Sequence, residues 1–302
     1  MNSPYSRQSA SDDFNRAKKK ARLSVIMNAF TPDRQRLLSL DEVRDIIKPR
    51  TEAYRGVTQV YIDKIIGSEG RYKDFSRAFF PKKELLRNRW ESIDKAHGDS
   101  VILPPVRLYE IGGVYFVRDG NHRVSVAKSV GALMIDAEIS SLDTDIRIAP
   151  GMSYDDIKRE VILFERERLF SNTNLAEIIS PVDLLFTATG RYGELLKHIE
   201  VHKYFINQNL PKELTFTEAA QSWYENLYKP IADVISEQNL MSRFPGRTTS
   251  DLYMWIINHW HFMKGEHGDG YPLESAIFEF TERFGKRWWA RFTTALSRLG
   301  RK

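Results

Sequence analysis

The segment of residues 114–129, with the sequence VYFVRDGNHRVSVAKS, constrains the fold of this chain more than any other. Its first four residues are β-branched or aromatic, which is typical of a strand. The polar residues 118–123 follow as a tight turn. Val124, Ala127 and Lys128 then recur at the spacing of one helix face, and Gly131 is a helix stop signal. The segment therefore predicts a strand, a turn and a helix in immediate succession.

The start of this predicted helix has the properties of a phosphate-binding site. A helix start leaves backbone N–H groups unpaired at the positive end of the helix dipole. Gly120 allows close approach of the backbone, and His122 and Arg123 supply side-chain donors. An ordinary Asp-Gly turn between a strand and a helix would give the same sequence, so both interpretations stay open on the local pattern alone.

The composition is that of a globular protein. The chain has 302 residues, which predicts two domains, and 42% of them are hydrophobic and 28% charged. It has no cysteine, which excludes disulfides, thiolate nucleophiles and cysteine-ligated metal centres. The first residues lack the apolar core of a secretory signal, and no apolar run is long enough to span a bilayer. We therefore expect a soluble, cytoplasmic protein without a transmembrane segment.

Basic residues gather near both ends of the chain, which carries a net charge of +5. The first cluster comprises Arg16, Lys18, Lys19, Lys20 and Arg22. The second comprises Arg283, Lys286, Arg287, Arg291, Arg298, Arg301 and Lys302. Such clusters can neutralise the phosphates of DNA, which makes DNA a candidate partner through the basic termini. A solvated helix face has the same composition.

The N-terminal half is predicted to mix helices and strands. We expect a disordered tail at 1–11, a helical segment at 12–56 and an α+β domain at 57–148. Within the helical segment, helices are expected at about 14–30 and from about Ser39. Within the domain, the patterns predict strands at 57–62, 106–111, 114–117 and 135–139, with a hairpin turn at Gly112-Gly113. A helix at about 82–96 would carry Leu85, Leu86, Trp90 and Ile93 on its apolar side.

Residues 151–302 are predicted to form a helical domain. Helices should begin near Ser153, Val182, Tyr192, Thr215, Thr249 and Leu273. Thr248 should cap its helix, with Asp251 in the first turn, and Arg247 beside this helix start is a weaker candidate anion site. His259, His261 and His267 lack the spacing of four that a paired-histidine metal site requires, so we predict no metal site there. The segment 283–292 mixes aromatic and basic residues, which suits base stacking or a membrane surface but equally a docked amphipathic helix.

The motifs and their order resemble the ParB/sulfiredoxin superfamily, often called the ParB-like nuclease domain. The matching text is LPPVRLYEIGGVYFVRDGNHRVSVAKSVGALMIDAEI at 103–139 and, upstream, VYIDKIIGSEGRYKDF at 60–75. The resemblance covers about residues 57–140 and is nearest to the Asp-Gly-x-x-Arg form, which occurs in relatives that phosphorylate a small molecule. It implies an α+β fold with a small mixed sheet and helices. The all-α C-terminal domain, predicted from its own pattern, follows it and has no known function.

The resemblance also implies nucleotide handling, with CTP or ATP bound together with Mg²⁺. Gly120, Asn121, His122, Arg123 and Arg71 would bind the nucleotide. Arg71 would also stabilise charge on a transferred phosphoryl group.

Glu69, Asp119 and His122 are the catalytic candidates that the resemblance implies. Glu69 would act as a general base or help to hold Mg²⁺, and Asp119 would cap the turn or act through Mg²⁺. Each also has a plain structural interpretation, such as a surface ion pair or a hydrogen bond that fixes the turn.

The chain departs from the family pattern in three respects. It lacks the second arginine that segregation proteins carry after the glycine-acid pair, a helix-turn-helix after the domain, and the cysteine of sulfiredoxin. We therefore rank first a nucleotide-binding regulator or switch, which nucleotide could drive into a homodimer. A small-molecule kinase or nucleotide hydrolase is the second hypothesis, and a DNA-binding or nuclease module is the third.

Overall fold

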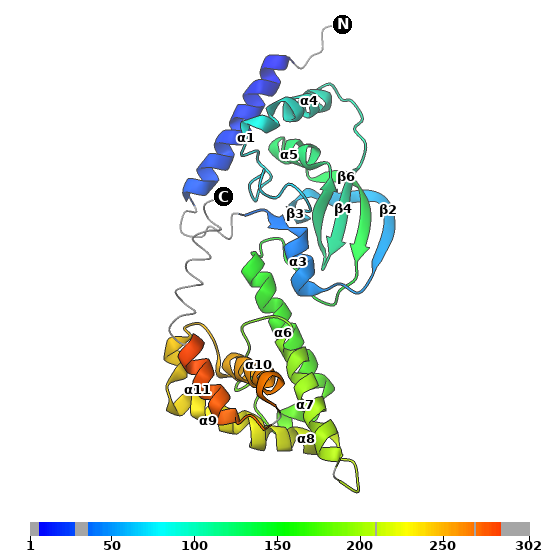
Figure 1. Ribbon diagram of the computed structural model, residues 1–302. Coiled ribbons are helices and arrows are strands. Elements are labelled where there is room, and N and C mark those ends of the chain that lie inside the picture. The colour runs from blue at the N-terminus through cyan, green and yellow to red at the C-terminus, as the bar shows by residue number, and fades with distance from the viewer. Residues whose placement is uncertain (1–5, 28–35, 209, 269, 285–302) are drawn as a thin grey trace. The chain divides into compact units, whose positions relative to one another are not determined.

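A computed structural model describes residues 6–27, 36–208, 210–268 and 270–284. The chain forms two compact units, residues 1–161 and 162–302. The first unit contains a mixed six-stranded sheet with helices, and in the described part of the second unit all regular elements are helical (Figure 1). The predicted α+β fold class, with helices in the C-terminal half, is confirmed.

The sheet of the first unit has the strand order β1-β3-β5-β4-β6-β2. β3 pairs in parallel with β1 and β5, and β4 pairs in parallel with β6, whereas β4–β5 and β2–β6 are antiparallel. The strands are β1 (Leu38–Ser39), β2 (Glu52–Tyr61), β3 (Ile65–Ser68), β4 (Val106–Ile111), β5 (Val114–Asp119) and β6 (Met134–Leu142). The Gly112-Gly113 turn joins β4 and β5, as the sequence predicts.

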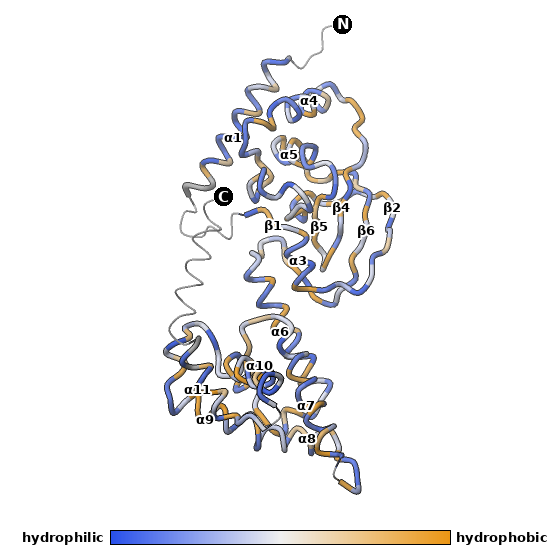
Figure 2. The backbone as a smooth tube through the Cα atoms, in the orientation of Figure 1, coloured by the Kyte–Doolittle hydropathy of each residue, from blue (hydrophilic) through white to orange (hydrophobic). Residues whose placement is uncertain are grey.

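Helices cover both faces of this sheet. α5 (Asn121–Ser129) packs against one face, with α4 (Arg87–Gly98) packed on α5 and α1 (Arg7–Met27) packed on α4, and α3 (Leu40–Ile47) lies on the other face (Figure 1). The first face is buried with the side chains of Phe14, Trp90, Val106, Leu108, Val117, Val124, Ala137 and Ile139. Figure 2 shows the hydrophobic stretch of β5 at the centre of this unit.

Strand alternation decides which face each side chain joins. Successive side chains of a strand point to opposite faces. Val106 and Leu108 of β4 therefore belong to the core beneath α4 and α5. Tyr109 follows Leu108 directly, so its side chain lies on the opposite face, where it contacts Arg44 of α3.

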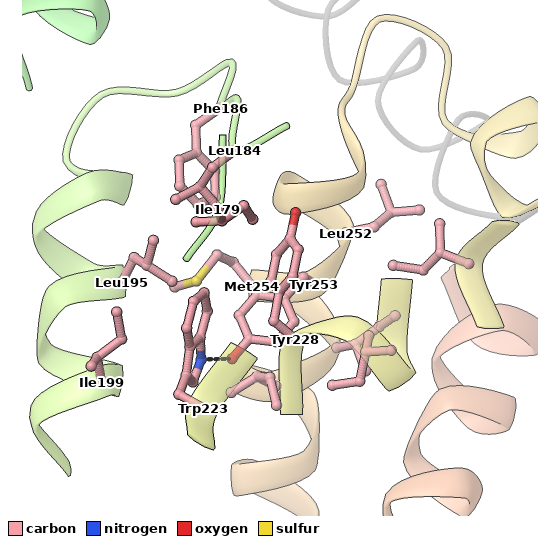
Figure 3. Close-up of a cluster of buried hydrophobic side chains, with 14 of the residues drawn as sticks. Ile179, Leu184, Phe186, Leu195, Ile199, Trp223, Tyr228, Leu252, Tyr253 and Met254 are labelled. Atoms are coloured by element: carbon pink, nitrogen blue, oxygen red, sulfur yellow. Dashed lines mark hydrogen bonds between the residues drawn. The ribbon is translucent and has the colours of Figure 1, made fainter. Parts of the chain in front are cut away.

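The described part of the second unit is a bundle of helices around an aromatic core. Its helices are α7 (Arg191–Asn207), α8 (Phe216–Trp223), α9 (Lys229–Glu237), α10 (Thr249–His267) and α11 (Leu273–Phe284), while α6 (Tyr154–Asn172) contributes residues to both units. A π-helical turn, Tyr224–Tyr228, joins α8 to α9. Trp223, Tyr228 and Tyr253 lie in the core, and the Trp223 indole N–H donates to the Tyr253 hydroxyl at 2.7 Å (Figure 3).

Helix caps in this unit follow the sequence. Thr215 and Thr248 each form a capping box, with Glu218 and Asp251 respectively, as predicted for Thr248. The helix that we predicted from Val182 is wrong. Residues 181–189 form turns instead, because Leu184 and Phe186 are buried in the core from a non-helical backbone.

Several boundaries in the first unit also differ from the sequence predictions. α1 begins at Arg7, inside the segment predicted as a disordered tail, because Ala10, Phe14 and Ala17 are buried along one helix face. β2 begins at Glu52, before the predicted start at Val57, and β3 is a strand for which the sequence patterns gave no prediction.

The predicted apolar face of the helix near residue 85 is also partly wrong. The α-helix begins at Arg87 after a 3₁₀ turn, Glu84–Leu86. The different helical period of this turn leaves Leu85 91% exposed, whereas Leu86 and Trp90 are buried.

Some predicted features lie outside the described residues. They are the last residues of the helix expected to reach residue 30 and nearly all of the C-terminal basic and aromatic segment, 285–302. Among the described helices, none combines the length and the apolar character that a bilayer crossing requires.

Candidate functional site

The two motifs that resemble the ParB/sulfiredoxin pattern meet where the parallel strands β3 and β5 end. β3 and β5 are parallel neighbours, with Ser68 paired with Val117. Glu69, which follows β3, donates its backbone N–H to the Val117 carbonyl at 3.0 Å, and the Arg71 N–H donates to the Ser68 hydroxyl at 3.3 Å. The loop after β3 therefore lies beside the turn from β5 into α5.

Gly120 begins α5 in a conformation that other residues rarely adopt. Its φ is 102°, and no side chain caps the helix. A Cβ at this position would lie 2.7 Å from Cγ1 of Val106 and 3.1 Å from Nε and Nη2 of Arg123. Both the backbone angle and the space require glycine here. The first bond of the helix runs from the Val124 N–H to the Gly120 carbonyl, so the N–H groups of residues 121–123 precede it.

Arg123 holds the approach to this helix start in place. Its side chain is only 13% exposed. Nη1 donates to the carbonyls of Pro104 and Pro105, and Nη2 donates to Oδ2 of Asp119 at 2.7 Å. Most of its hydrogen-bond donors are therefore used within the protein. In this arrangement Arg123 shapes the site, whereas the sequence had suggested that it binds phosphate directly.

Two buried polar groups at the start of α5 have no partner among the described residues. They are Oδ1 of Asn121 and Nδ1 of His122. Asn121 is only 8% exposed. An unpaired buried polar group costs about 1–3 kcal/mol. The oxygen and nitrogen of an Asn amide are interchangeable in shape, so a rotated Asn121 amide would offer donors at the same place.

Cations surround the imidazole of His122. Burial, followed by the positive charges of Arg71 and Arg89, lowers its pKa to about 4, while Asp74 acts in the opposite direction. Its ring meets the ring of Phe75 edge-on at 5.6 Å between centroids. His122 is therefore neutral at pH 7, in a setting whose nearest ionised groups are mainly positive.

The two arginines near His122 have free donors. Arg71 lies 3.9 Å from Asp74, a distance too long for a hydrogen bond, and its side chain is 53% exposed. Arg89 is exposed on α4 and has no ion pair within the described part of the chain. Sequence reasoning found Arg71 but missed Arg89, because only the packing of α4 against α5 brings that helix to the site.

The three catalytic candidates have different surroundings. His122 and Arg71 lie on the α5 side. Asp119 is 68% exposed at the mouth of this site, where it pairs with Arg123. The negative charge of Glu69 is one of the causes that raise the Tyr109 pKa, after burial and Glu52, and Tyr109 lies on the face covered by α3.

The described residues contain no group of three or more His, Cys, Asp or Glu side chains placed to hold a metal ion. His259 lies 3.7 Å from Glu279, while the rings of His261 and His267 contact His198 and Tyr271. Arg247 donates a hydrogen bond to the Thr187 hydroxyl, and this hydroxyl donates a hydrogen bond to Asp251.

Comparison with known proteins adds little to this geometry. No family model and no curated protein matches the chain. A solved structure described as the C2221 form of a Pnob8-like ParB-N domain is 13% identical and covers 78% of this chain and 84% of that chain, with a TM-score of 0.21. A likeness at that TM-score decides neither fold nor function.

Proposed function

We propose that the first unit binds a phosphorylated ligand at the start of α5, and that this ligand is a nucleoside triphosphate such as CTP or ATP. One observation carries the proposal. The uncapped N-terminal end of α5 presents backbone N–H groups beside two buried polar atoms that have no partner among the described residues, Oδ1 of Asn121 and Nδ1 of His122. Helix starts of this kind favour phosphate, because the N–H groups and the helix dipole both stabilise negative charge.

The surrounding residues supply the remaining requirements of a phosphate site. Arg71 and Arg89 bring positive charge from the loop after β3 and from α4, and both have free guanidinium donors. Gly120 keeps the approach to the backbone open, and Arg123 fixes the turn. Neutral His122 can donate one hydrogen bond, and a bound anion would favour its protonation.

Mg²⁺ would accompany the triphosphate. Magnesium in nucleotide sites is held largely by phosphate oxygens and water, with one or two carboxylates. Asp119 fits this limited role, since its exposed carboxylate pairs with Arg123 through Oδ2 only.

A thermal-shift panel tests the proposal. CTP, ATP and GTP, each with Mg²⁺, are added to the full chain, because a ligand that binds only the folded state raises its stability. We expect at least one triphosphate to raise the melting temperature, and the Arg71→Ala/Arg89→Ala variant to abolish that rise. Arg55→Ala, an exposed arginine of β2, is the matched control. If no triphosphate stabilises the protein, or if the control loses the shift equally, the proposal fails.

We further propose that nucleotide acts as a regulatory signal and promotes a homodimer. Sedimentation of the full chain with and without the stabilising nucleotide tests this role. A mass that does not change with nucleotide would rule out the dimer.

Phosphoryl transfer or nucleotide hydrolysis is the second candidate, and the position of Asp119 at the mouth of the site favours it. Asp119→Asn should then lower turnover more than Glu69→Gln, because Asp119 contacts Arg123 in the first turn of α5. His122→Asn tests the third catalytic candidate. Release of inorganic phosphate is the measurement, and equal turnover in all variants would remove these residues from the reaction.

DNA association is a third candidate, through the described cations of α1. Lys18 pairs with Glu84 and Arg16 pairs with Asp13, but Lys19 and Arg22 are exposed without an ion pair in the described residues. Binding of duplex DNA should then weaken steeply with salt and weaken further in Lys19→Ala/Arg22→Ala.

A further inference from the structure

A second group of charged residues lies on the opposite face of the sheet from α5. Its centre is Tyr109 of β4, which is only 6% exposed. The guanidinium of Arg118, from β5, lies 5.4 Å from the centroid of the Tyr109 ring, and that of Arg44, from α3, lies 5.9 Å from it. One tyrosine ring thus holds two arginines that are far apart in the sequence.

The donors of both arginines are free. Neither the Arg44 nor the Arg118 side chain makes a hydrogen bond or an ion pair with any described residue. Stacking on an aromatic ring uses the face of the guanidinium and leaves its N–H groups, which lie in its plane, available. Two guanidinium groups with unused donors, 5.9 Å and 5.4 Å from the same ring centroid, are suited to a carboxylate or a phosphate.

Two glutamates and the two arginines act on Tyr109 with opposite charge, but in the described part of the chain the glutamates do not form ion pairs with the arginines. After burial, the carboxylate of Glu52 on β2 and that of Glu69 after β3 raise the pKa of Tyr109, while Arg118 and Arg44 lower it. Neither glutamate lies within ion-pair distance of the two arginines in the described structure. Arg107 of β4, a third arginine of this region, differs because it pairs with Glu138 at 3.0 Å.

Ordinary structural roles do not use these donors. Arg44 lies in the last turn of α3, where a cation is favoured by the helix dipole, and both arginines make a cation–π contact with the ring. Because these interactions already restrict the two side chains, a ligand that binds them would lose less side-chain entropy on binding.

We propose that Arg44 and Arg118, held by Tyr109, form a binding site for a small oxyanion, either a carboxylate or a phosphate. The site is independent of the phosphate site at α5. Arg118 and Asp119 are adjacent in β5, so the two sites lie on opposite faces of the same end of that strand.

Titration of the full chain with inorganic phosphate and with succinate, at constant ionic strength, tests the proposal. The readout is the Nε–Hε NMR signal of each arginine, assigned through the variants. We expect the signals of Arg44 and Arg118 to shift along a saturating curve with at least one of the two anions. The anion that saturates at lower concentration identifies the preferred group.

The variants define the outcome. Arg44→Gln and Arg118→Gln should each weaken binding about tenfold or more, since each removes charge-assisted hydrogen bonds. Both should melt close to the wild-type temperature, because neither side chain has an internal hydrogen bond. Arg107→Gln is the control and should bind as the wild type does. Linear shifts without saturation, or an equal loss in Arg107→Gln, would overturn the proposal.

The same NMR signals distinguish this site from the proposed phosphate site at α5. In Arg71→Ala/Arg89→Ala the Arg44 and Arg118 signals should still saturate. If the Arg44 and Arg118 signals saturate in a wild-type chain that binds no triphosphate, the proposed function fails and this site stands. If the wild-type chain binds a triphosphate and these signals do not saturate, this site fails and the proposed function stands.

Discussion

Arg118 and Asp119 are consecutive residues of β5 that serve opposite faces of the sheet. The Arg118 guanidinium lies 5.4 Å from the ring centroid of Tyr109, whereas Oδ2 of Asp119 lies 2.7 Å from Nη2 of Arg123. This divergence follows from strand alternation. It divides the residues of one short motif between two charged sites, one at the start of α5 and one beneath Arg44.

Gly120→Ala should destabilise the first unit by about 2–4 kcal/mol. The positive φ costs about 1 kcal/mol for alanine, and the new Cβ would lie 2.7 Å from Val106. Gly113→Ala is the matched control, since Gly113 has a φ of 95° but nothing within 4 Å of its Cβ position, and should cost only about 1 kcal/mol. Urea unfolding measures both. Equal losses would show that the close contact does not matter.

His122 should make the first unit less stable in acid. Its pKa in the folded protein is about 4, below the value of about 6.5 in an unfolded chain. Between these values the unfolded state binds more protons, so stability is constant above about pH 6.5 and falls as the pH drops toward 4. The loss is about 1.4 kcal/mol per pKa unit, or about 3 kcal/mol in total.

His122→Asn removes this contribution, and the difference between wild type and variant isolates it from His198, His202 and His261, whose pKa values burial also lowers. Trp90 is the only tryptophan of residues 1–161, so the ¹⁹F signal of 5-fluorotryptophan at this position reports unfolding of the first unit. A wild-type–variant difference that does not change between pH 7 and pH 4 would contradict the account.

Arg123→Ala should cost about 2 kcal/mol and Asp119→Ala less than about 1 kcal/mol. Arg123 is 13% exposed and binds two backbone carbonyls, whereas its partner Asp119 is 68% exposed and their ion pair is screened by water. Denaturant unfolding of the two variants measures the difference. A larger loss in Asp119→Ala would mean that the ion pair, and not the carbonyl contacts, fixes the turn.

Tyr253→Phe should destabilise the second unit by about 1–3 kcal/mol. It leaves the buried Trp223 indole N–H without its acceptor, which lies at 2.7 Å. Tyr204→Phe, at a position 63% exposed, should change stability by less than about 0.5 kcal/mol. Thermal unfolding distinguishes them, and similar melting temperatures for the two variants would count against the buried bond.

Much of the sheet could be predicted from local sequence. The strands at Val106 and Val114, the glycine turn between them and the helix after Gly120 follow from residue alternation and turn chemistry. The caps at Thr215 and Thr248 are equally local. By contrast, β3 is four residues long and gains its place only by pairing with β5, a contact between residues about fifty positions apart that no local pattern encodes.

The sequence motifs contained some of the residues that lie near the start of α5, but they did not show which other elements pack beside them. Gly120 and Arg71 lie where the motifs suggested, at adjacent loops. Arg89, Arg44 and Tyr109 could not be found, because each reaches its site from a separate element through packing. The role of Arg123 also depends on tertiary contacts, with the Pro104 and Pro105 carbonyls.

The pKa of His122 with and without nucleotide tests the central claim most directly. The Cε1–H NMR signal of His122, identified by its loss in His122→Asn, is followed against pH in the full chain, first alone and then with saturating CTP or ATP and Mg²⁺. A phosphate at the start of α5 would raise this pKa from about 4 by at least one unit, because negative charge stabilises the imidazolium. Nucleotide that binds without changing the His122 pKa would place the phosphates elsewhere and contradict the account.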